Sequence, residues 1–338
     1  MLQVLATASA ILLILGNCLI PKDSSAQVRI TIGYAAVSPR AIPLWIAQEE
    51  GLFRRYGIEA RFVVFRGAPT LVASLVAGHI DLGITSGGTV LGAAAGGIDL
   101  KIIAAPSNRL TPDLIARPHI KKVSDLPGKR FGVQSIGGGV WMFTMLGLES
   151  LGLDPKRENI RLITIGDSVL IGEALENGTI DGAFLDGALS RRLRRKGFSV
   201  LAELYHSNIP FINQGAVVSS TYLQQHSDLV EKVVTGLVEA LSFSLAPVNK
   251  SSVLKIFSKH LKISDPVVAE EGYQDFLHSV ERKPYPSVEA LRNAQRMMRI
   301  LNPQVGGINV EDLIESRFVR KLDESGFIDR VYRGYGGK

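Results

Sequence analysis

Apolar residues along this chain alternate between short β-branched runs and segments with helical spacing. The run Val28–Tyr34 predicts a buried strand, and Ile42–Glu50 predicts a helix that stops at Gly51. Further strands are predicted at Glu59–Phe65, Ile80–Ile84, Leu100–Ala105, Lys129–Gln134, Ile160–Ile165, Ile180–Leu185 and Ser199–Leu204. Helices are predicted between them at Pro69–Ala77, Val140–Leu151 and Ser168–Asn177. This alternation with short loops predicts an α/β fold with a mostly parallel sheet.

The pattern changes after this region. Gln214–Ser219 predicts one more strand, and from Thr221 onward the chain is largely helical. The predicted helices are Asp228–Leu245, Ser252–His260, Pro266–Leu277, Ser287–Leu301 and Val310–Ser325. The Gly-rich, basic end Tyr332–Lys338 is expected to fray.

Two segments, 71–87 and 171–187, are similar at a spacing of 100 residues. The identical residues are Leu75 and Leu175, Gly78 and Gly178, Ile80 and Ile180, Asp81 and Asp181, and Gly87 and Gly187. Each segment predicts a helix, a short turn and an Ile-Asp pair entering a strand, so the two copies predict two α/β lobes of similar build. We expect Asp81 and Asp181 to be structural, accepting hydrogen bonds from turn amides.

Composition indicates a globular protein with a sizeable core. Of 338 residues, 46% are hydrophobic and 21% are charged, and the net charge is +6. Basic residues concentrate in Ser190–Gly197, which we interpret as the solvated face of a helix. No nucleic-acid-binding motif accompanies this cluster, so nucleic acid is not an expected partner.

The N-terminus has the pattern of an export signal. Leu2–Ile20 is mostly apolar and uncharged, and Ser24–Ala26 offers the small residues that a signal peptidase reads. Residues 1–26 are therefore predicted to be a signal peptide cleaved before Gln27, which places the protein in the periplasm or another extracytoplasmic space. The alternatives are a retained membrane anchor and lipidation at Cys18. Cys18 is the single cysteine, so the mature protein has no internal disulfide.

Several short motifs follow one another in the order of a known family. They are Ile32–Tyr34, Pro43–Ala47, Glu50–Phe53, Tyr56–Ile58, Leu75–Gly83, Asp125–Lys129, Gly152–Pro155 and Gly178–Ala183. Through them the chain resembles the periplasmic solute-binding proteins of ABC importers. The branch in question takes up aliphatic sulfonates, taurine, nitrate and thiamine-precursor pyrimidines. The resemblance covers roughly 28–220.

This resemblance implies the two-lobe periplasmic-binding-protein type II fold, with the ligand cleft between the lobes. The first lobe would comprise residues 27–112 and 215–338, and the second lobe residues 113–214. The protein would be a monomer that closes on a small polar organic molecule and docks on an ABC permease in the membrane. No catalytic residue, metal or cofactor is implied.

Three loops are expected to face the cleft, because ligands of open α/β sheets bind at the carboxyl ends of the strands and near helix N-termini. The loops are Ala35–Ser38, Thr85–Thr89 and Ser135–Gly139, and ordinary βα turns have a similar composition. Their candidate ligand-binding residues are Ala36, Ser38, Ser86, Gly87, Thr89, Ser135 and Gly138. Sulfonate-binding members carry extra hydroxyl residues in the third loop, where this chain has glycines, which weakens a sulfonate assignment.

Asp186 follows a predicted strand at a position that faces the cleft in relatives. A carboxylate there would repel an anion and favour an amine or a hydroxyl-rich neutral ligand. The alternative is that Asp186 caps the helix starting near Ala188, because Asp is a preferred N-cap residue.

Three further candidates have weaker support. Trp45 and Trp141 lie on the first predicted helix of each lobe, where either could stack on a planar ligand or pack in the core. Of these, Trp141 is kept as a candidate ligand-binding residue. Asn213, with Phe211 and Gln214 beside it, is expected to line the hinge side of the cleft.

The same fold also houses enzymes. Dehydratases of menaquinone synthesis are cytoplasmic, which conflicts with the export signal, and thiamine-pyrimidine synthases rely on a cysteine-rich iron motif that one cysteine cannot provide. The six histidines show no metal-binding spacing. We therefore expect a binding protein, with a two-lobe enzyme of either kind as the alternative.

Overall fold

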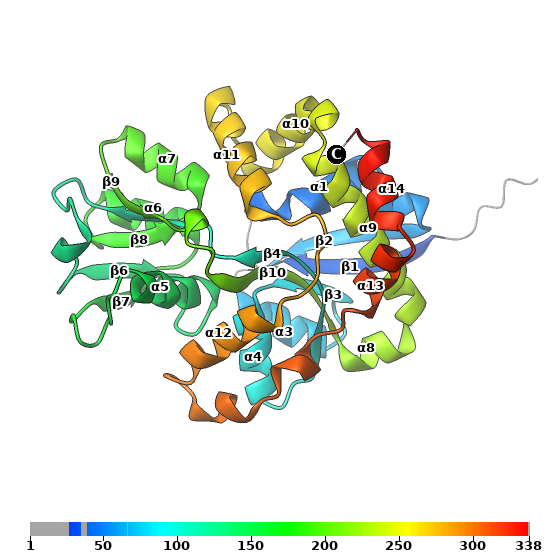
Figure 1. Cartoon of the computed structure of the whole chain (residues 1–338), viewed down its shortest axis with the longest axis horizontal. Coiled ribbons are helices and arrows are strands. Elements are labelled where there is room, and N and C mark those ends of the chain that lie inside the picture. The colour runs from blue at the N-terminus through cyan, green and yellow to red at the C-terminus, as the bar shows by residue number, and fades with distance from the viewer. Residues whose placement is uncertain (1–26, 35–38, 66, 337–338) are drawn as a thin grey trace, which may run out of the picture.

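The structure, a computed structural model, describes residues 27–34, 39–65 and 67–336 of the chain. Its strands form two five-stranded sheets, and the sheets with their helices make two lobes lying side by side (Figure 1). The predicted signal peptide, residues 1–26, lies outside the described residues. Within the described part, no helix combines the length and the apolar character needed to span a membrane.

The first sheet has the strand order β2-β1-β3-β10-β4. Its strands are β1 (Val28–Tyr34), β2 (Ile58–Val64), β3 (Leu82–Thr85), β4 (Leu100–Arg109) and β10 (Pro210–Ser219). Strands β2, β1 and β3 are parallel, and β10 runs antiparallel to both β3 and β4. All residues of β3 are buried, as expected for a central strand that helices cover on both faces.

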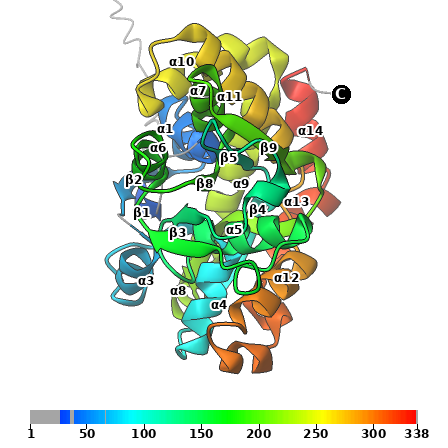
Figure 2. The same cartoon turned by 90° about the vertical axis from the view of Figure 1, so that its left-hand side faces the viewer.

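The second sheet has the strand order β7-β6-β8-β5-β9. Its strands are β5 (Asp113–Ala116), β6 (Arg130–Val133), β7 (Arg161–Thr164), β8 (Gly182–Leu185) and β9 (Ser199–Glu203). Strands β7, β6 and β8 are parallel, and β5 is antiparallel to β8 and β9. Figure 2, turned so that this lobe faces the viewer, shows helices on both sides of its sheet.

The two sheets share one plan. Position by position, β2, β1, β3, β10 and β4 of the first sheet correspond to β7, β6, β8, β5 and β9 of the second. The antiparallel strand of each sheet is reached by a crossing from the other lobe, through residues 110–112 and 207–209. The two crossings lie side by side, because the backbone N–H of Leu110 donates to the carbonyl of Ile209 at 3.0 Å. This pair of segments forms the hinge.

The internal repeat is confirmed element by element. The repeated helices are α3 (Ala68–Val76) with α6 (Ser168–Glu176), and α4 (Gly87–Ala95) with α7 (Gly187–Arg195). Strands β3 and β8 lie between them, and every bound of one copy differs from the other by 100. Both copies turn at a left-handed glycine, Gly78 with φ 69° and Gly178 with φ 83°, which only glycine adopts readily.

Asp81 and Asp181 tie the strands of each copy together. The carboxylate of Asp81 accepts from the backbone N–H of Thr31 at 2.7 Å, and that of Asp181 accepts from the N–H of Arg130 at 2.9 Å. Their structural role is confirmed, although the donors lie on the neighbouring strand and not in a turn. Asp181 also forms an ion pair with the Arg130 guanidinium, whose hydrogen bonds lower the pKa of Asp181 to about 2.

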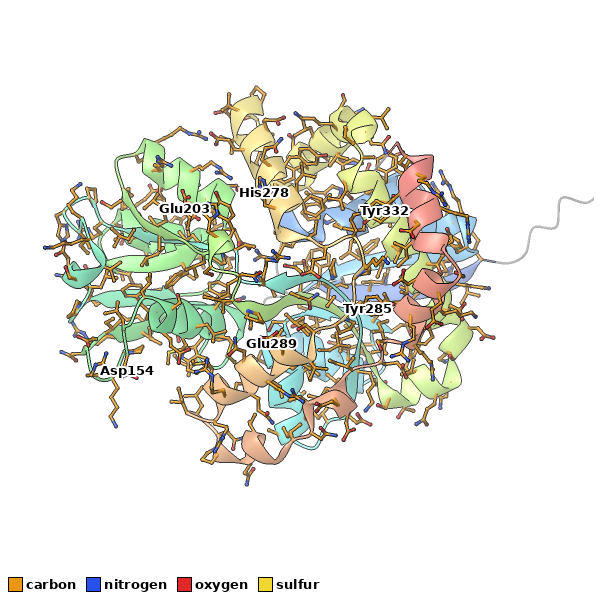
Figure 3. All side chains as sticks on the ribbon, in the orientation of Figure 1. Asp154, Glu203, His278, Tyr285, Glu289 and Tyr332 are labelled. Carbon is orange, nitrogen blue, oxygen red and sulfur yellow. The ribbon has the colours of Figure 1, made fainter. Side chains whose placement is uncertain are left out.

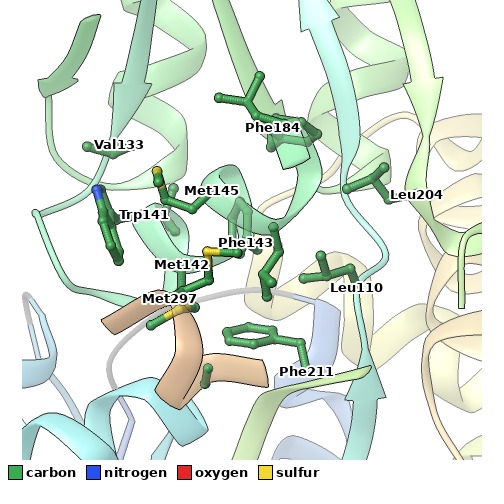
Figure 4. Packing of buried hydrophobic residues seen from close by; sticks show 14 of the residues in the cluster. Leu110, Val133, Trp141, Met142, Phe143, Met145, Phe184, Leu204, Phe211 and Met297 are labelled. Carbon is green, nitrogen blue, oxygen red and sulfur yellow. The ribbon is translucent and has the colours of Figure 1, made fainter. Parts of the chain in front are cut away.

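The remaining helices surround the sheets and fill the contact between the lobes. They are α1 (Ile42–Glu49), α2 (Leu52–Arg55), α5 (Gly139–Ser150), α8 (Ser220–Gln225), α9 (Ser227–Leu245), α10 (Lys250–Leu261), α11 (Pro266–Ser279), α12 (Val288–Met298), α13 (Arg317–Glu324) and α14 (Phe327–Gly334). One apolar cluster crosses from lobe to lobe, where Met142 of α5 meets Met297 of α12 and Phe211 of β10 (Figure 4).

Some elements differ from the sequence-based prediction. Strand β5 was not predicted, and β10 begins at Pro210, so that residues 210–214 lie in the first sheet and not with the second lobe. The end of the chain is helical as far as Gly334. Frayed residues were expected from Tyr332, but that side chain is buried and its hydroxyl donates to the carbonyl of Arg282 at 3.0 Å (Figure 3). This anchor explains why the last turn is ordered.

Candidate functional site

Two of the three predicted cleft loops, those at the carboxyl ends of β3 and β6, are described. The first loop, with the candidates Ala36 and Ser38, lies outside the described residues. The other two loops are described, and the structure brings them together.

Ser86, Gly87 and Thr89 form the N-terminus of α4. Ser86 is the N-cap residue: its hydroxyl accepts from the Thr89 N–H at 3.3 Å and lies 3.1 Å from the Thr89 hydroxyl. Gly87 is buried, and a Cβ there would lie 2.8 Å from a methyl group of Leu291 on α12. The first-lobe candidates therefore have a clear structural role as a helix cap, and they lie at the lobe boundary.

The loop with Ser135 and Gly138 leads into α5 of the second lobe. The carbonyl of Ser135 accepts from the Gly138 N–H at 3.2 Å, which closes a turn before the helix. A Cβ on Gly139 would lie 3.2 Å from the Ser86 hydroxyl oxygen of the first lobe. The N-termini of α4 and α5 therefore face each other across the boundary, and helix N-termini present free N–H donors and partial positive charge.

Asp186 makes the most informative contact of the predicted candidates. It occupies the N-cap position of α7, but its carboxylate makes no capping hydrogen bond within the described residues. Instead, its Oδ1 accepts from Nη1 of Arg40 at 2.6 Å and its Oδ2 from Nη2 at 2.9 Å. The two side chains come from different lobes and are only 12% and 14% exposed. This bidentate ion pair closes the space between the lobes at the hinge side.

Arg40 was not predicted as a site residue. It lies in the 3-10 turn Pro39–Ala41 that precedes α1, directly after the first cleft loop, and its Nη1 also approaches the hydroxyl of Thr111 at 3.5 Å. Its position directly after that loop was the one feature of the sequence that could have marked Arg40 as a candidate site residue. Because Arg40 compensates the charge of Asp186, the site does not present an isolated carboxylate to the ligand.

The two tryptophans are buried. Trp141 lies in the apolar cluster at the lobe boundary, near Val133, Met142 and Met145 (Figure 4). Trp45 lies in the core of the first lobe and stacks on His260, with 4.7 Å between the ring centroids.

Three polar atoms near the hinge are buried without a hydrogen-bond partner among the described residues. They are Nδ2 of Asn213, Oε1 of Gln214 and the hydroxyl of Ser107. Gln214 and Ser107 are register partners on β10 and β4. Buried polar groups are normally paired, so each of these atoms is a candidate hydrogen-bond partner for a ligand or a water molecule.

A small cavity of about 40 Å³ lies behind Arg40 and Gln214. Its other walls are largely apolar and are formed by Pro43, Leu44, Ile84, Ala104, Pro106, Gly215, Ala216, Leu237, Leu241 and Pro284. All these residues belong to first-lobe elements, and the volume is sufficient to hold a water molecule.

The basic helix α7 docks on α11 of the first lobe. Arg195 contacts both carboxylate oxygens of Glu271 at 3.0 and 2.8 Å, and Arg191 forms an ion pair with Asp275. A Cβ on Gly187, at the start of α7, would overlap the carboxylate of Asp275. The interpretation of this cluster as a solvated helix face was therefore wrong for the side that meets α11.

Asp113 is a buried acid directly after the first crossing segment, residues 110–112. Its carboxylate accepts from the Ser190 hydroxyl at 2.5 Å. Burial raises the pKa of Asp113 to about 6, and the nearby carboxylates of Glu203 and Asp186 add to this effect. Among the described residues, no group of three or more His, Cys, Asp and Glu side chains is arranged to hold a metal ion.

This architecture defines the class: a two-lobe α/β protein of the type II periplasmic-binding-protein fold, as the sequence predicted. The chain belongs to the NMT1/THI5-like family, whose model matches residues 38–248, and the predicted family resemblance is confirmed. A candidate binding protein of Brucella abortus is 25% identical over 245 residues, which are 70% of this chain and 73% of that protein.

Solved structures share this fold. The alkanesulfonate-binding protein of Xanthomonas axonopodis pv. citri, bound to MOPS, has a TM-score of 0.68 at 20% identity, with 85% of this chain and 98% of that chain covered. The ligand-binding component of an ABC-type import system from Staphylococcus aureus, with zinc bound, has a TM-score of 0.69 at 16% identity, with 87% and 98% covered.

Proposed function

We propose that this protein is the extracytoplasmic solute-binding component of an ABC import system. It closes on a small polar organic molecule between its lobes and delivers this molecule to a membrane permease. The names of the similar proteins support a binding role and an import partner. The observation that carries the proposal is the meeting of Arg40 and Asp186 from opposite lobes at the hinge side of the cleft.

The proposed mechanism follows from the shape of the molecule. The lobes open about the two crossing segments, the ligand enters between the N-termini of α4 and α5, and closure buries it. Closed lobes form a continuous surface across α4, α5 and α12, which the permease can distinguish from the open state. The protein acts as a monomer, and export through residues 1–26 places it on the permease's outer side.

A ligand screen tests this function. The mature chain from Gln27 onward is mixed with alkanesulfonates, nitrate, amines, pyrimidines and small dipolar acids, and its melting temperature is measured. A ligand at ten times its Kd adds about 1.4 kcal/mol to the free energy of unfolding, which raises the melting temperature by a few degrees. Arg40→Gln should abolish this shift. Arg29→Gln, which removes an exposed ion pair with Glu59 outside the cleft, should leave it unchanged.

The outcome that contradicts the proposal is equally specific. If no compound shifts the melting temperature and the purified protein converts a candidate substrate to product, the two-lobe enzyme is the better assignment. Cell fractionation adds an independent check, because the proposed importer requires the mature protein to be outside the cytoplasm.

A further inference from the structure

The Arg40–Asp186 ion pair restricts the kind of ligand that the cleft can accept. Both side chains are largely withdrawn from water, and each of the two carboxylate oxygens is engaged by one guanidinium nitrogen. A ligand that binds directly to these two groups must separate them. Each group then needs a new partner, because a buried charge without one is strongly unfavourable.

Ligands with a single charge satisfy only half of this requirement. An anion can replace Asp186 on Arg40, but it leaves the carboxylate of Asp186 unpaired. A cation can replace Arg40 on Asp186, but among the described residues it leaves the guanidinium with only the distant Thr111 hydroxyl, 3.5 Å away. Arg191, the next cation on α7, does not take the place of Arg40 beside Asp186, because it is already paired with Asp275. Only a molecule with both charges re-pairs both side chains at once.

We propose, building on the function above, that the ligand is a small dipolar molecule with an acid group bound by Arg40 and a protonated amine bound by Asp186. In this structure, each of the two side chains occupies the position that the oppositely charged group of the ligand would take. The dipolar molecule inserts between them and leaves the lobes slightly further apart at the hinge side.

The surroundings offer this ligand further hydrogen-bonding groups. Oε1 of Gln214, which lines the same cavity as Arg40, is buried without a partner among the described residues, as is Nδ2 of the adjacent Asn213. The cavity of about 40 Å³ has all its walls in the first lobe.

Matched probes test this proposal by calorimetry and thermal shift. The dipolar probes are glycine, β-alanine and taurine, the anionic ones are acetate, propanoate and ethanesulfonate, and the cationic ones are ethylamine and propylamine. A dipolar probe should bind at least about tenfold more tightly than its singly charged counterparts. Asp186→Asn should weaken the dipolar probe about a hundredfold and strengthen the matching anion about tenfold, because Arg40 loses its internal partner.

Two controls make the result decisive. Arg29→Gln should leave every affinity unchanged. The double variant Arg40→Gln, Asp186→Asn keeps the site neutral and serves if the single variant fails to fold. It should bind no charged probe. Equal affinity of propanoate and β-alanine, or no effect of Asp186→Asn, overturns the proposal. Binding of only alkanesulfonates, nitrate or pyrimidines overturns it too but leaves the solute-binding function in place. Binding of no compound in this panel or in the wider screen, together with turnover of a candidate substrate, overturns both.

Discussion

Asp113 shows how one residue at the lobe boundary makes stability depend on pH. The pKa of its carboxyl is about 6 in the folded protein, against an ordinary value of 3.8. The folded state therefore holds this proton more tightly than the unfolded chain. The contribution of Asp113 to stability is complete below pH about 4 and is lost as the pH rises through about 6.

The variant Asp113→Asn tests this sign. Asparagine keeps an acceptor for the Ser190 hydroxyl but carries no charge, so the variant should gain stability relative to the wild type as the pH rises. Between pH about 4 and about 7.5, the difference in the free energy of unfolding should change by about 2 kcal/mol. Urea unfolding at both pH values measures it. A difference that is the same at both would show that Asp113 titrates normally.

Single residues were the least predictable level of this molecule. Asp186 was selected because it follows a predicted strand at a position that faces the cleft in relatives, and the end of a strand can be read from the sequence. Its partner Arg40 lies 146 residues away in the sequence, and only the closure of two lobes brings the charges together. Composition and periodicity contain no information on such a contact.

At the scale of elements, ion pairs between α7 and α11 hold the two lobes together. Arg195→Glu places two carboxylates in contact and should lower the free energy of unfolding by about 1 kcal/mol at low salt, because partly exposed pairs are worth little. Adding Glu271→Arg should restore most of the loss by reversing the pair. A double-mutant cycle at low and high salt measures the coupling. A coupling energy of zero at low salt would show that the Arg195–Glu271 ion pair does not stabilise the contact between the lobes.

Most elements were predictable because their apolar periodicity is strong. The helix and strand bounds in the repeated segments agree within two residues with the prediction, and Asp81 and Asp181 have the structural role expected of them. Strand β5 was missed because its short apolar run, Leu114–Ala116, stands between Pro112 and Pro118, and such prolines indicate a loop. The predicted helix over 310–325 is two elements, a 3-10 turn and α13, which begins at Arg317.

At the scale of the whole molecule, closure can be tested with one covalent bond. The Cβ of Ser86 lies 3.4 Å from the place a Cβ of Gly139 would take, close to the roughly 3.5–4.5 Å of a disulfide. Ser86→Cys with Gly139→Cys should therefore lock the lobes shut under oxidising conditions. Once a ligand is known, its association rate should fall at least about a hundredfold and recover on reduction.

Ser86→Cys alone is the matched control for this lock. It loses the cap of α4, at a cost of about 1 kcal/mol, but it leaves the lobes free to separate. If the fully oxidised double variant binds its ligand at the normal rate, ligand entry does not require the lobes to separate.

The exchange of strands at the hinge also has a consequence for biosynthesis. A ribosome releases all five strands of the second sheet before β10 appears, because that sheet is complete by Glu203. The first sheet must wait, since β10 occupies the place between β3 and β4. Domains usually fold in their order of synthesis. Here the lobe that begins later is the one that finishes first, and the earlier lobe stays open until residues 210–219 arrive to close it.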